Sequence, residues 1–160
     1  MYVEKFNVLQ HPDYTEKLCQ EIARRYANDN IELVVGPTTG GILLAHECGK
    51  ALGTRAIFTE RENGKMTLKR GFAIPKGIRC LVVEDIVTTG GSVREVMDVV
   101  KEYGGIVVGI GLLVDRSGGK VDFGVRTEPL LRLDVTTYKT EDCPLCKDNV
   151  PMTKRGRTGK

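Results

Sequence analysis

Two adjacent carboxylates followed by a hydroxyl-rich turn give this sequence its clearest chemical signal. Glu84 and Asp85 end an apolar run over residues 81–83, and two residues later the chain continues as Thr88-Thr89-Gly90-Gly91-Ser92. This order is typical of a buried strand, an anion-binding loop and the N-terminus of a helix, where backbone N–H groups point at the anion. The glycines let the main chain approach a phosphate closely, and the hydroxyls add hydrogen-bond donors.

The two acids make this signal specific for a phosphorylated sugar. Carboxylates accept hydrogen bonds from the vicinal hydroxyls of a ribose, and they stabilise positive charge that develops at a sugar carbon. Side chains alternate along a strand, so at least one of Glu84 and Asp85 is expected to point into the site. A solvated strand end is the alternative. The sequence has no Gly-Lys-Ser or Gly-Lys-Thr step, which argues against a nucleoside-triphosphate loop.

The rest of the sequence predicts elements that would position this motif. Apolar spacing predicts helices over 12–26, 40–52 and 92–103, strands over 31–35, 55–58, 80–85, 106–114 and 130–138, and a short antiparallel strand over 71–75. Strands that alternate with helices imply right-handed crossovers. The predicted fold class is therefore α/β, with a central, mainly parallel sheet flanked by helices on both faces.

Chemically active segments are expected to meet at one edge of this sheet, because ligands of parallel sheets bind outside the carboxyl ends of the strands. Those ends carry Gly36–Gly41, the charged excursion Thr59–Arg70, the acid pair with its loop, and Asp115-Arg116. The convergence of four such segments predicts one binding site. For the excursion, a solvated charged surface is the alternative. For Arg116, the alternative is a surface ion pair with Asp115 or Asp122.

Bulk properties indicate a single domain of 160 residues with a formal net charge of +3. Much of the excess charge lies in a Cys-containing basic tail at about residues 139–160, namely Lys147, Lys154, Arg155, Arg157 and Lys160. We interpret it as a frayed terminus and expect no nucleic-acid partner. No apolar run approaches the ~20 residues needed to cross a bilayer, and the N-terminus lacks a signal-peptide pattern. We therefore expect a cytoplasmic protein with no membrane partner.

The cysteines fit a reducing compartment. Cys19, Cys48 and Cys80 lie singly among apolar residues and are predicted to be reduced core residues. Cys143 and Cys146 form one C-x-x-C in a polar segment with no second pair nearby, so a turn with two thiols is favoured. A metal site shared between subunits and a local disulfide are the alternatives.

The stretch over 81–92 resembles the phosphoribosyl-diphosphate signature of the type I phosphoribosyltransferases, and the resemblance extends over nearly the whole chain. Gly36–Gly41 resembles the diphosphate-binding loop of the family. Phe58-Thr59-Glu60-Arg61 and the charged excursion lie where the family carries a mobile catalytic loop. Val114–Gly119 resembles the segment from which members that act on orotate extend an arginine to the pyrimidine. The N-terminal segment Tyr2–Pro12 and the Cys-Pro-Leu-Cys sequence near the C-terminus are also similar to bacterial and archaeal members that act on orotate.

This resemblance implies transfer of the phosphoribosyl group from 5-phospho-α-D-ribose 1-diphosphate to N1 of orotate. The products would be orotidine 5′-monophosphate and diphosphate, a step of UMP biosynthesis. It also implies a homodimer and a Mg²⁺ ion held mainly by phosphoribosyl diphosphate, with no ligand directly from the protein. A purine base as acceptor and a regulator that has lost catalysis are the alternatives.

Residue roles also follow from the resemblance. Glu84 and Asp85 would hold the ribose hydroxyls, while Lys65, Lys69 and Arg70 would close over the diphosphate. Thr88 and Arg116 would bind orotate. The implied site for phosphoribosyl diphosphate comprises Thr38, Thr39, Gly40, Gly41, Arg61, Glu84, Asp85, Ile86, Val87, Thr88, Thr89, Gly90, Gly91 and Ser92. Two departures from the family pattern stand out, since the excursion has no His and the family's N-terminal segment before Tyr2 is missing. We therefore expect a reduced hood over the base.

Overall fold

The computed structural model describes residues 3–135, 138, 141–148 and 150–151. Its strands are β1 (Leu33–Pro37), β2 (Arg55–Glu62), β3 (Lys65–Leu68), β4 (Arg79–Val87), β5 (Ile106–Asp115) and β6 (Arg126–Arg132). Its helices are α1 (Phe6–Leu9), α2 (Pro12–Arg25), α3 (Gly40–Leu52), α4 (Gly91–Glu102) and α5 (Pro144–Lys147). The predicted residues Tyr2, Lys154, Arg155, Arg157 and Lys160 lie outside the described part of the chain.

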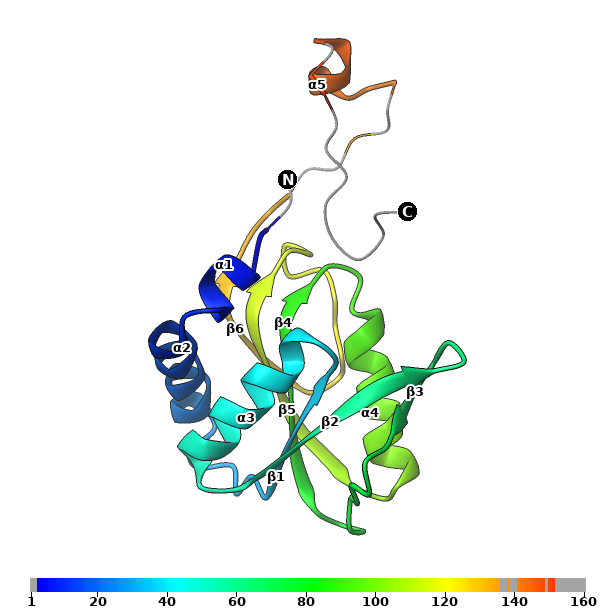
Figure 1. Ribbon diagram of the computed structural model, residues 1–160. Helices are drawn as coiled ribbons and strands as arrows, with labels where there is room; N and C mark the ends of the chain where they lie inside the picture. The colour runs from blue at the N-terminus through cyan, green and yellow to red at the C-terminus, as the bar shows by residue number, and fades with distance from the viewer. Residues whose placement is uncertain (1–2, 136–137, 139–140, 149, 152–160) are drawn as a thin grey trace.

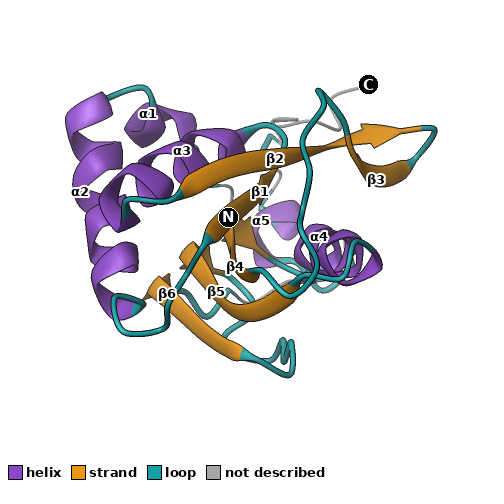
Figure 2. Cartoon of the chain, turned by 90° about the horizontal axis from the view of Figure 1, so that it is seen from below, coloured by secondary structure: helices purple, strands orange, loops and turns teal. Residues whose placement is uncertain are grey.

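The six strands form one sheet in the order β3-β2-β1-β4-β5-β6, shown in Figure 1. The pairings of β1 with β2 and β4, of β4 with β5 and of β5 with β6 are parallel, whereas β2 and β3 pair antiparallel. Figure 2 shows α2 and α3 on one face of the sheet and α4 on the other. The predicted α/β architecture is confirmed.

The central strands are apolar throughout because both of their faces are covered. Val34 on β1 and Leu81 on β4 lie in register and pack toward α2 and α3, whereas Val35 and Val82 pack toward α4. The predicted core cysteines Cys19, Cys48 and Cys80 are buried and unbonded.

The charged excursion forms a β-hairpin, which corrects two predicted boundaries. Strand β2 does not stop at residue 58 but continues to Glu62, and β3 pairs with it from Lys65. Asn63 and Gly64 connect them with φ values of 50° and 82°, the combination that a two-residue hairpin turn requires. The antiparallel strand predicted over 71–75 is therefore wrong. The Asn-Gly dipeptide was the available signal for the real one.

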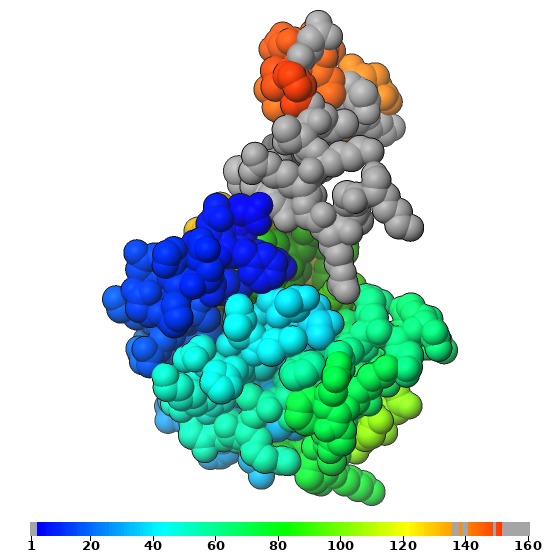
Figure 3. Space-filling view, viewed as in Figure 1, coloured from blue at the N-terminus to red at the C-terminus, as the bar shows by residue number. Residues whose placement is uncertain are grey.

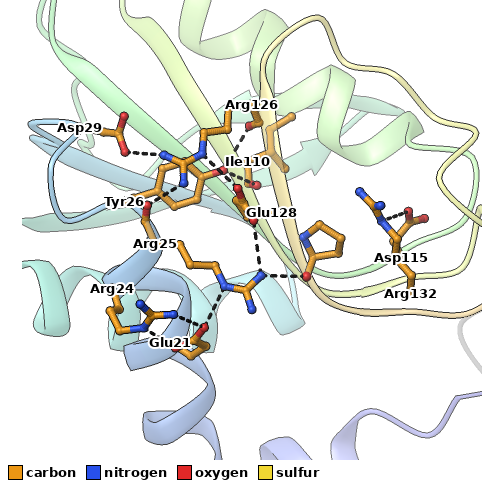
Figure 4. A network of polar contacts seen from close by, with 11 residues as sticks. Glu21, Arg24, Arg25, Tyr26, Asp29, Ile110, Asp115, Arg126, Glu128 and Arg132 are labelled. Atoms are coloured by element: carbon orange, nitrogen blue, oxygen red, sulfur yellow. Dashed lines mark hydrogen bonds and ion pairs between the residues drawn. The ribbon is translucent and has the colours of Figure 1, made fainter.

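The last strand also begins earlier than predicted, at Arg126 and not at residue 130, and it ends at Arg132. Polar contacts hold its first half, as Figure 4 shows. The Arg126 guanidinium lies 4.7 Å from the centre of the Tyr26 ring and donates a 2.9 Å hydrogen bond to Asp29. An edge strand held by such contacts leaves no apolar pattern in its sequence.

Candidate active site

The loop that follows β4 forms a polar cavity. Gly90, the N-cap of α4, has φ 79°, and an added Cβ would lie 2.8 Å from Val121 and 2.9 Å from Phe123. The cavity measures about 170 Å³ and is lined by Glu84, Ile86, Val87, Thr88, Thr89, Gly90, Gly91, Ser92 and Val93. Its donors include the backbone at the N-terminus of the 12-residue helix α4. The predicted succession of strand, loop and helix is confirmed.

The acid pair points to opposite sides of the sheet. Strand β4 continues to Val87, so the side chains still alternate at Glu84 and Asp85. Glu84 is 8% exposed and lines the cavity of the loop. Asp85 is 2% exposed and faces the other side, next to Gly40 at the start of α3. The expectation that at least one acid points into the site is confirmed, and that acid is Glu84.

Asp85 lies between a lysine and a helix N-terminus. The Lys5 ammonium lies 2.8 Å from Oδ1 and 2.6 Å from Oδ2. Gly40, the first residue of α3, comes so close that an added Cβ would lie 1.6 Å from Oδ2. Both neighbours favour a negative charge. No local pattern predicts the Lys5 contact, because the two residues are 80 positions apart.

Glu84 has a raised pKa. Burial, followed by the negative charge of Asp85, raises the pKa of Glu84 to about 8. The Asp85 backbone N–H, which donates a 3.0 Å hydrogen bond to Oε1, and the Lys5 charge act in the opposite direction. A carboxyl whose pKa lies this close to neutrality is characteristic of functional sites.

We expect Glu84→Gln to stabilise the fold, and to do so more at high pH. The pKa of Glu84 in the fold lies above its ordinary value of 4.5. Its favourable contribution is therefore complete below that value and is lost as the pH rises through the folded pKa. The melting temperature of the variant minus that of the wild type should rise from near zero at about pH 5 to roughly 3 °C at about pH 9. Thermal melts across this range test it, and a difference independent of pH would contradict it.

The loop between β1 and α3 is compressed against its own backbone. An added Cβ on Gly36 would lie 2.2 Å from the Gly41 carbonyl oxygen, so this turn requires glycine. The Thr38 N–H donates a 2.9 Å hydrogen bond to the Thr59 carbonyl of β2. Because β1 and β4 are neighbours in the sheet, the loop Thr38–Gly41 lies beside the acid pair. The predicted meeting of these two segments is confirmed.

Arg116 follows β5 directly, and its backbone is held beside the loop Thr88–Ser92. Its backbone N–H donates a 2.8 Å hydrogen bond to the Val87 carbonyl, one residue before Thr88. The neighbouring Asp115 is buried and accepts hydrogen bonds from the Ser117 N–H and hydroxyl and the Gly119 N–H. Asp115 therefore organises the turn that presents Arg116.

The cations of the hairpin lie away from this cavity. Arg61 pairs with Glu95 of α4 at 2.5 Å, Lys69 with Glu62 at 2.6 Å, and Arg70 with Glu60 at 2.8 Å. Lys65 lines a separate groove against α4, together with Glu95, Asp98 and Glu102. None of the four cations lines the cavity of Glu84 and the loop. The structure does not bring them to the acid pair.

The described residues offer neither a cluster of metal ligands nor a membrane-spanning helix. No group of three or more His, Cys, Asp or Glu there could hold a metal ion, and no helix there is long and apolar enough to cross a membrane. Cys143 is the N-cap residue of the single turn α5 and Cys146 lies within it, and neither forms a disulfide.

Comparison with known proteins places the site in a family context. Residues 7–123 match the family described as Phosphoribosyl transferase domain. The orotate phosphoribosyltransferase of Pelotomaculum thermopropionicum is 60% identical over 149 residues, covering 93% of this chain and 78% of that protein. The orotate phosphoribosyltransferase of Thermotoga maritima is 48% identical over 158 residues, covering 99% and 84%.

Solved structures show the same fold. Mycobacterium tuberculosis orotate phosphoribosyltransferase in complex with inorganic phosphate matches with a TM-score of 0.69 and 28% identity, covering 82% of this chain and 78% of that one. Adenine phosphoribosyltransferase from Rhodothermus marinus matches with a TM-score of 0.66 over 79% and 83% of the two chains. At 22% identity, the second match bears on the fold alone.

Proposed function

The chain belongs to the orotate phosphoribosyltransferases, within the phosphoribosyl transferase domain family, and from this membership we propose which of its residues carry the reaction. The cavity shared by Glu84 and the loop Thr88–Ser92 supports the proposal most directly. It combines a carboxylate for sugar hydroxyls with backbone donors for a phosphate, and phosphoribosyl diphosphate carries both groups. Thr38–Gly41 lies alongside and would take the diphosphate.

The reaction forms a bond from N1 of orotate to C1 of the ribose and breaks the bond from C1 to the diphosphate oxygen. Positive charge develops at C1 as the leaving group departs, so no protein nucleophile is required. Glu84 and Asp85 would hold the ribose hydroxyls, and the negative charge of Asp85, together with that of Glu84 when it is ionised, would stabilise this cation. The loops would fix the phosphate and diphosphate ends, so that C1 faces the base.

Mg²⁺ would enter this site as a complex with phosphoribosyl diphosphate. The described residues hold no ligand cage of three or more His, Cys, Asp or Glu, so we propose that the ion is held mainly by the diphosphate and ribose oxygens. When bound, Mg²⁺ offsets negative charge on the leaving diphosphate. Thr38–Gly41 and Thr88–Ser92 would then bind the magnesium complex through neutral N–H and O–H donors.

We propose a homodimer in which the hairpin serves a neighbouring site. Figure 1 shows the tip of the β2–β3 hairpin projecting from the edge of the molecule. Lys65, Lys69, Arg70 and Arg61 would reach diphosphate in the partner or after movement of the hairpin. We further propose that residues 1–160 form one domain with a tail at about 139–160, and that the protein acts in the cytoplasm without nucleic-acid partners.

The acceptor base can be tested by direct assay. Purified protein with phosphoribosyl diphosphate and Mg²⁺ should convert orotate to orotidine 5′-monophosphate, and should leave adenine, hypoxanthine and xanthine unchanged. Turnover of a purine alone would replace the proposed acceptor. Absence of turnover with all four bases would favour a regulator that has kept only the ligand site.

We expect Arg116→Ala to weaken orotate binding selectively. Loss of a charge-assisted contact to the base should raise the KM for orotate by roughly 10- to 100-fold. The KM for phosphoribosyl diphosphate should change by less than about threefold, since that ligand binds the other loops. Arg24→Ala, which removes an exposed arginine of α2 away from the site, is the matched control. Equal effects on the two KM values would argue against a role for Arg116 at the base.

A further inference from the structure

The segment before α1 reaches the acid pair through one side chain. Lys5 is the residue just before α1, and its ammonium contacts both oxygens of Asp85, at 2.8 Å and 2.6 Å. Figure 3 shows the N-terminal residues in dark blue, lying over the same end of the molecule as the residues that begin α3. The Lys5 side chain keeps 29% of its surface exposed, whereas that of Asp85 keeps 2%.

Asp85 needs this partner more than a surface carboxylate would. Only 2% of its side chain is exposed, and a buried carboxylate is costly unless it is paired. Its other close neighbour is Gly40, where helix α3 begins with a partial positive charge. Lys5 and the start of α3 therefore hold the Asp85 carboxylate from two sides.

The position of Asp85 is transmitted to Glu84 through the backbone. The Asp85 N–H donates a 3.0 Å hydrogen bond to Oε1 of Glu84, the acid that lines the cavity. The charged groups that act on Glu84 are Asp85 of the same strand and Lys5 from the segment before α1. Asp85 raises the pKa of Glu84, whereas Lys5 lowers it.

We propose that Lys5 is a positioning residue for phosphoribosyl transfer, which fixes Asp85 against the start of α3 and thereby orients Glu84 in the cavity. This inference rests on the proposed function of the site. Lys5 touches Asp85 and not the cavity of the loop, so it acts through the acid pair. Through Asp85, Lys5 also connects the N-terminal segment with the loop Thr38–Gly41.

Kinetics of Lys5→Met and Lys5→Arg test the proposal. We expect Lys5→Met to lower kcat by about tenfold or more, and to change the KM for orotate by less than about threefold. Lys5→Arg keeps the ion pair and should restore kcat to within about threefold of the wild type. Lys17→Met, at an exposed position of α2, is the matched control and should keep wild-type kinetics.

The pH profile and a double variant separate positioning from general stability. Without the ammonium, the pKa of Glu84 should rise, so the acidic limb of the kcat/KM profile should move to higher pH in Lys5→Met and return in Lys5→Arg. The double variant Lys5→Met with Asp85→Asn should be no slower than Asp85→Asn alone, because Asp85→Asn already removes the ion pair through which Lys5 acts. Additive losses, or an unmoved profile, would overturn the proposal.

A carboxyl NMR titration distinguishes failure of this inference from failure of the proposed function. Glu84 can be assigned by comparing ¹³C-labelled wild type with Glu84→Gln, and its titration followed in Lys5→Met without any turnover. An upward shift relative to the wild type supports the action of Lys5 on Glu84 even if no base is converted. An unchanged titration overturns it even if orotate is converted.

Discussion

Replacing Glu84 with Gln and Asp85 with Asn together should lower kcat/KM for phosphoribosyl diphosphate by about 10³-fold. Both replacements keep the shape of the side chain and remove the negative charge, so they remove the electrostatic stabilisation of the developing cation at C1. The fold should persist, because the two residues lie near the end of β4 and contribute little apolar packing. Steady-state assays with far-UV circular dichroism check both parts.

A matched control uses two exposed acids far from the cavity, Asp13 of α2 and Glu141. Asp13→Asn with Glu141→Gln removes the same charge, and should keep kcat/KM within about twofold of the wild type. If the control and the active-site variant lose activity equally, net charge is the cause. Unchanged activity in the variant of the acid pair would remove both carboxylates from the mechanism.

The acid-and-loop motif could be predicted because it is local in sequence. An apolar run, two acids, hydroxyls and glycines mark the end of β4 and the start of α4 within 12 consecutive residues. Parallel topology then brought Gly36–Gly41 and Arg116 to the same edge, since the carboxyl ends of neighbouring parallel strands lie together. Alternation along β4 also predicted that at least one acid would point into the site.

The parts that were missed depend on pairing between distant residues. Arg126 begins β6 because Tyr26 and Asp29 hold it, and neither lies near it in sequence. The contact between Lys5 and Asp85 likewise joins residues that are far apart in sequence. The hairpin is different, since Asn63-Gly64 was a local signal that was outweighed by the charge of the surrounding residues.

The divided acid pair changes what the two carboxylates can do. Glu84 lines the cavity with a raised pKa, whereas Asp85 is held by Lys5 and the start of α3. A single charge next to the anion-binding loop repels a phosphorylated ligand less than two would. The arrangement therefore keeps a second carboxylate beside the acid that lines the cavity, while its charge is balanced by Lys5 and the start of α3.

Gly40→Ala should damage the site from outside the acid pair. Gly40 is the first residue of α3, and alanine is in general the better helix former, by about 1 kcal/mol in a helix interior. An added Cβ, however, would lie 1.6 Å from Oδ2 and 2.7 Å from Cγ of Asp85, so either the carboxylate or the helix must move. We expect the melting temperature to fall by roughly 5 °C and kcat/KM to fall by about 10²-fold. Lys50→Ala, an exposed position of the same helix, is the control.

A second substitution shows whether the clash with the carboxylate is the cause. Asp85→Ala removes Oδ2 and Cγ, leaving only the Cβ at position 85, which would lie 3.4 Å from the new methyl group in ordinary contact. Gly40→Ala should therefore cost little stability in an Asp85→Ala background, whereas activity should stay low because the second acid is gone. Thermal melts of the four proteins measure this coupling. If Gly40→Ala lowers the melting temperature equally in both backgrounds, the glycine is required by the loop itself and not by its contact with Asp85.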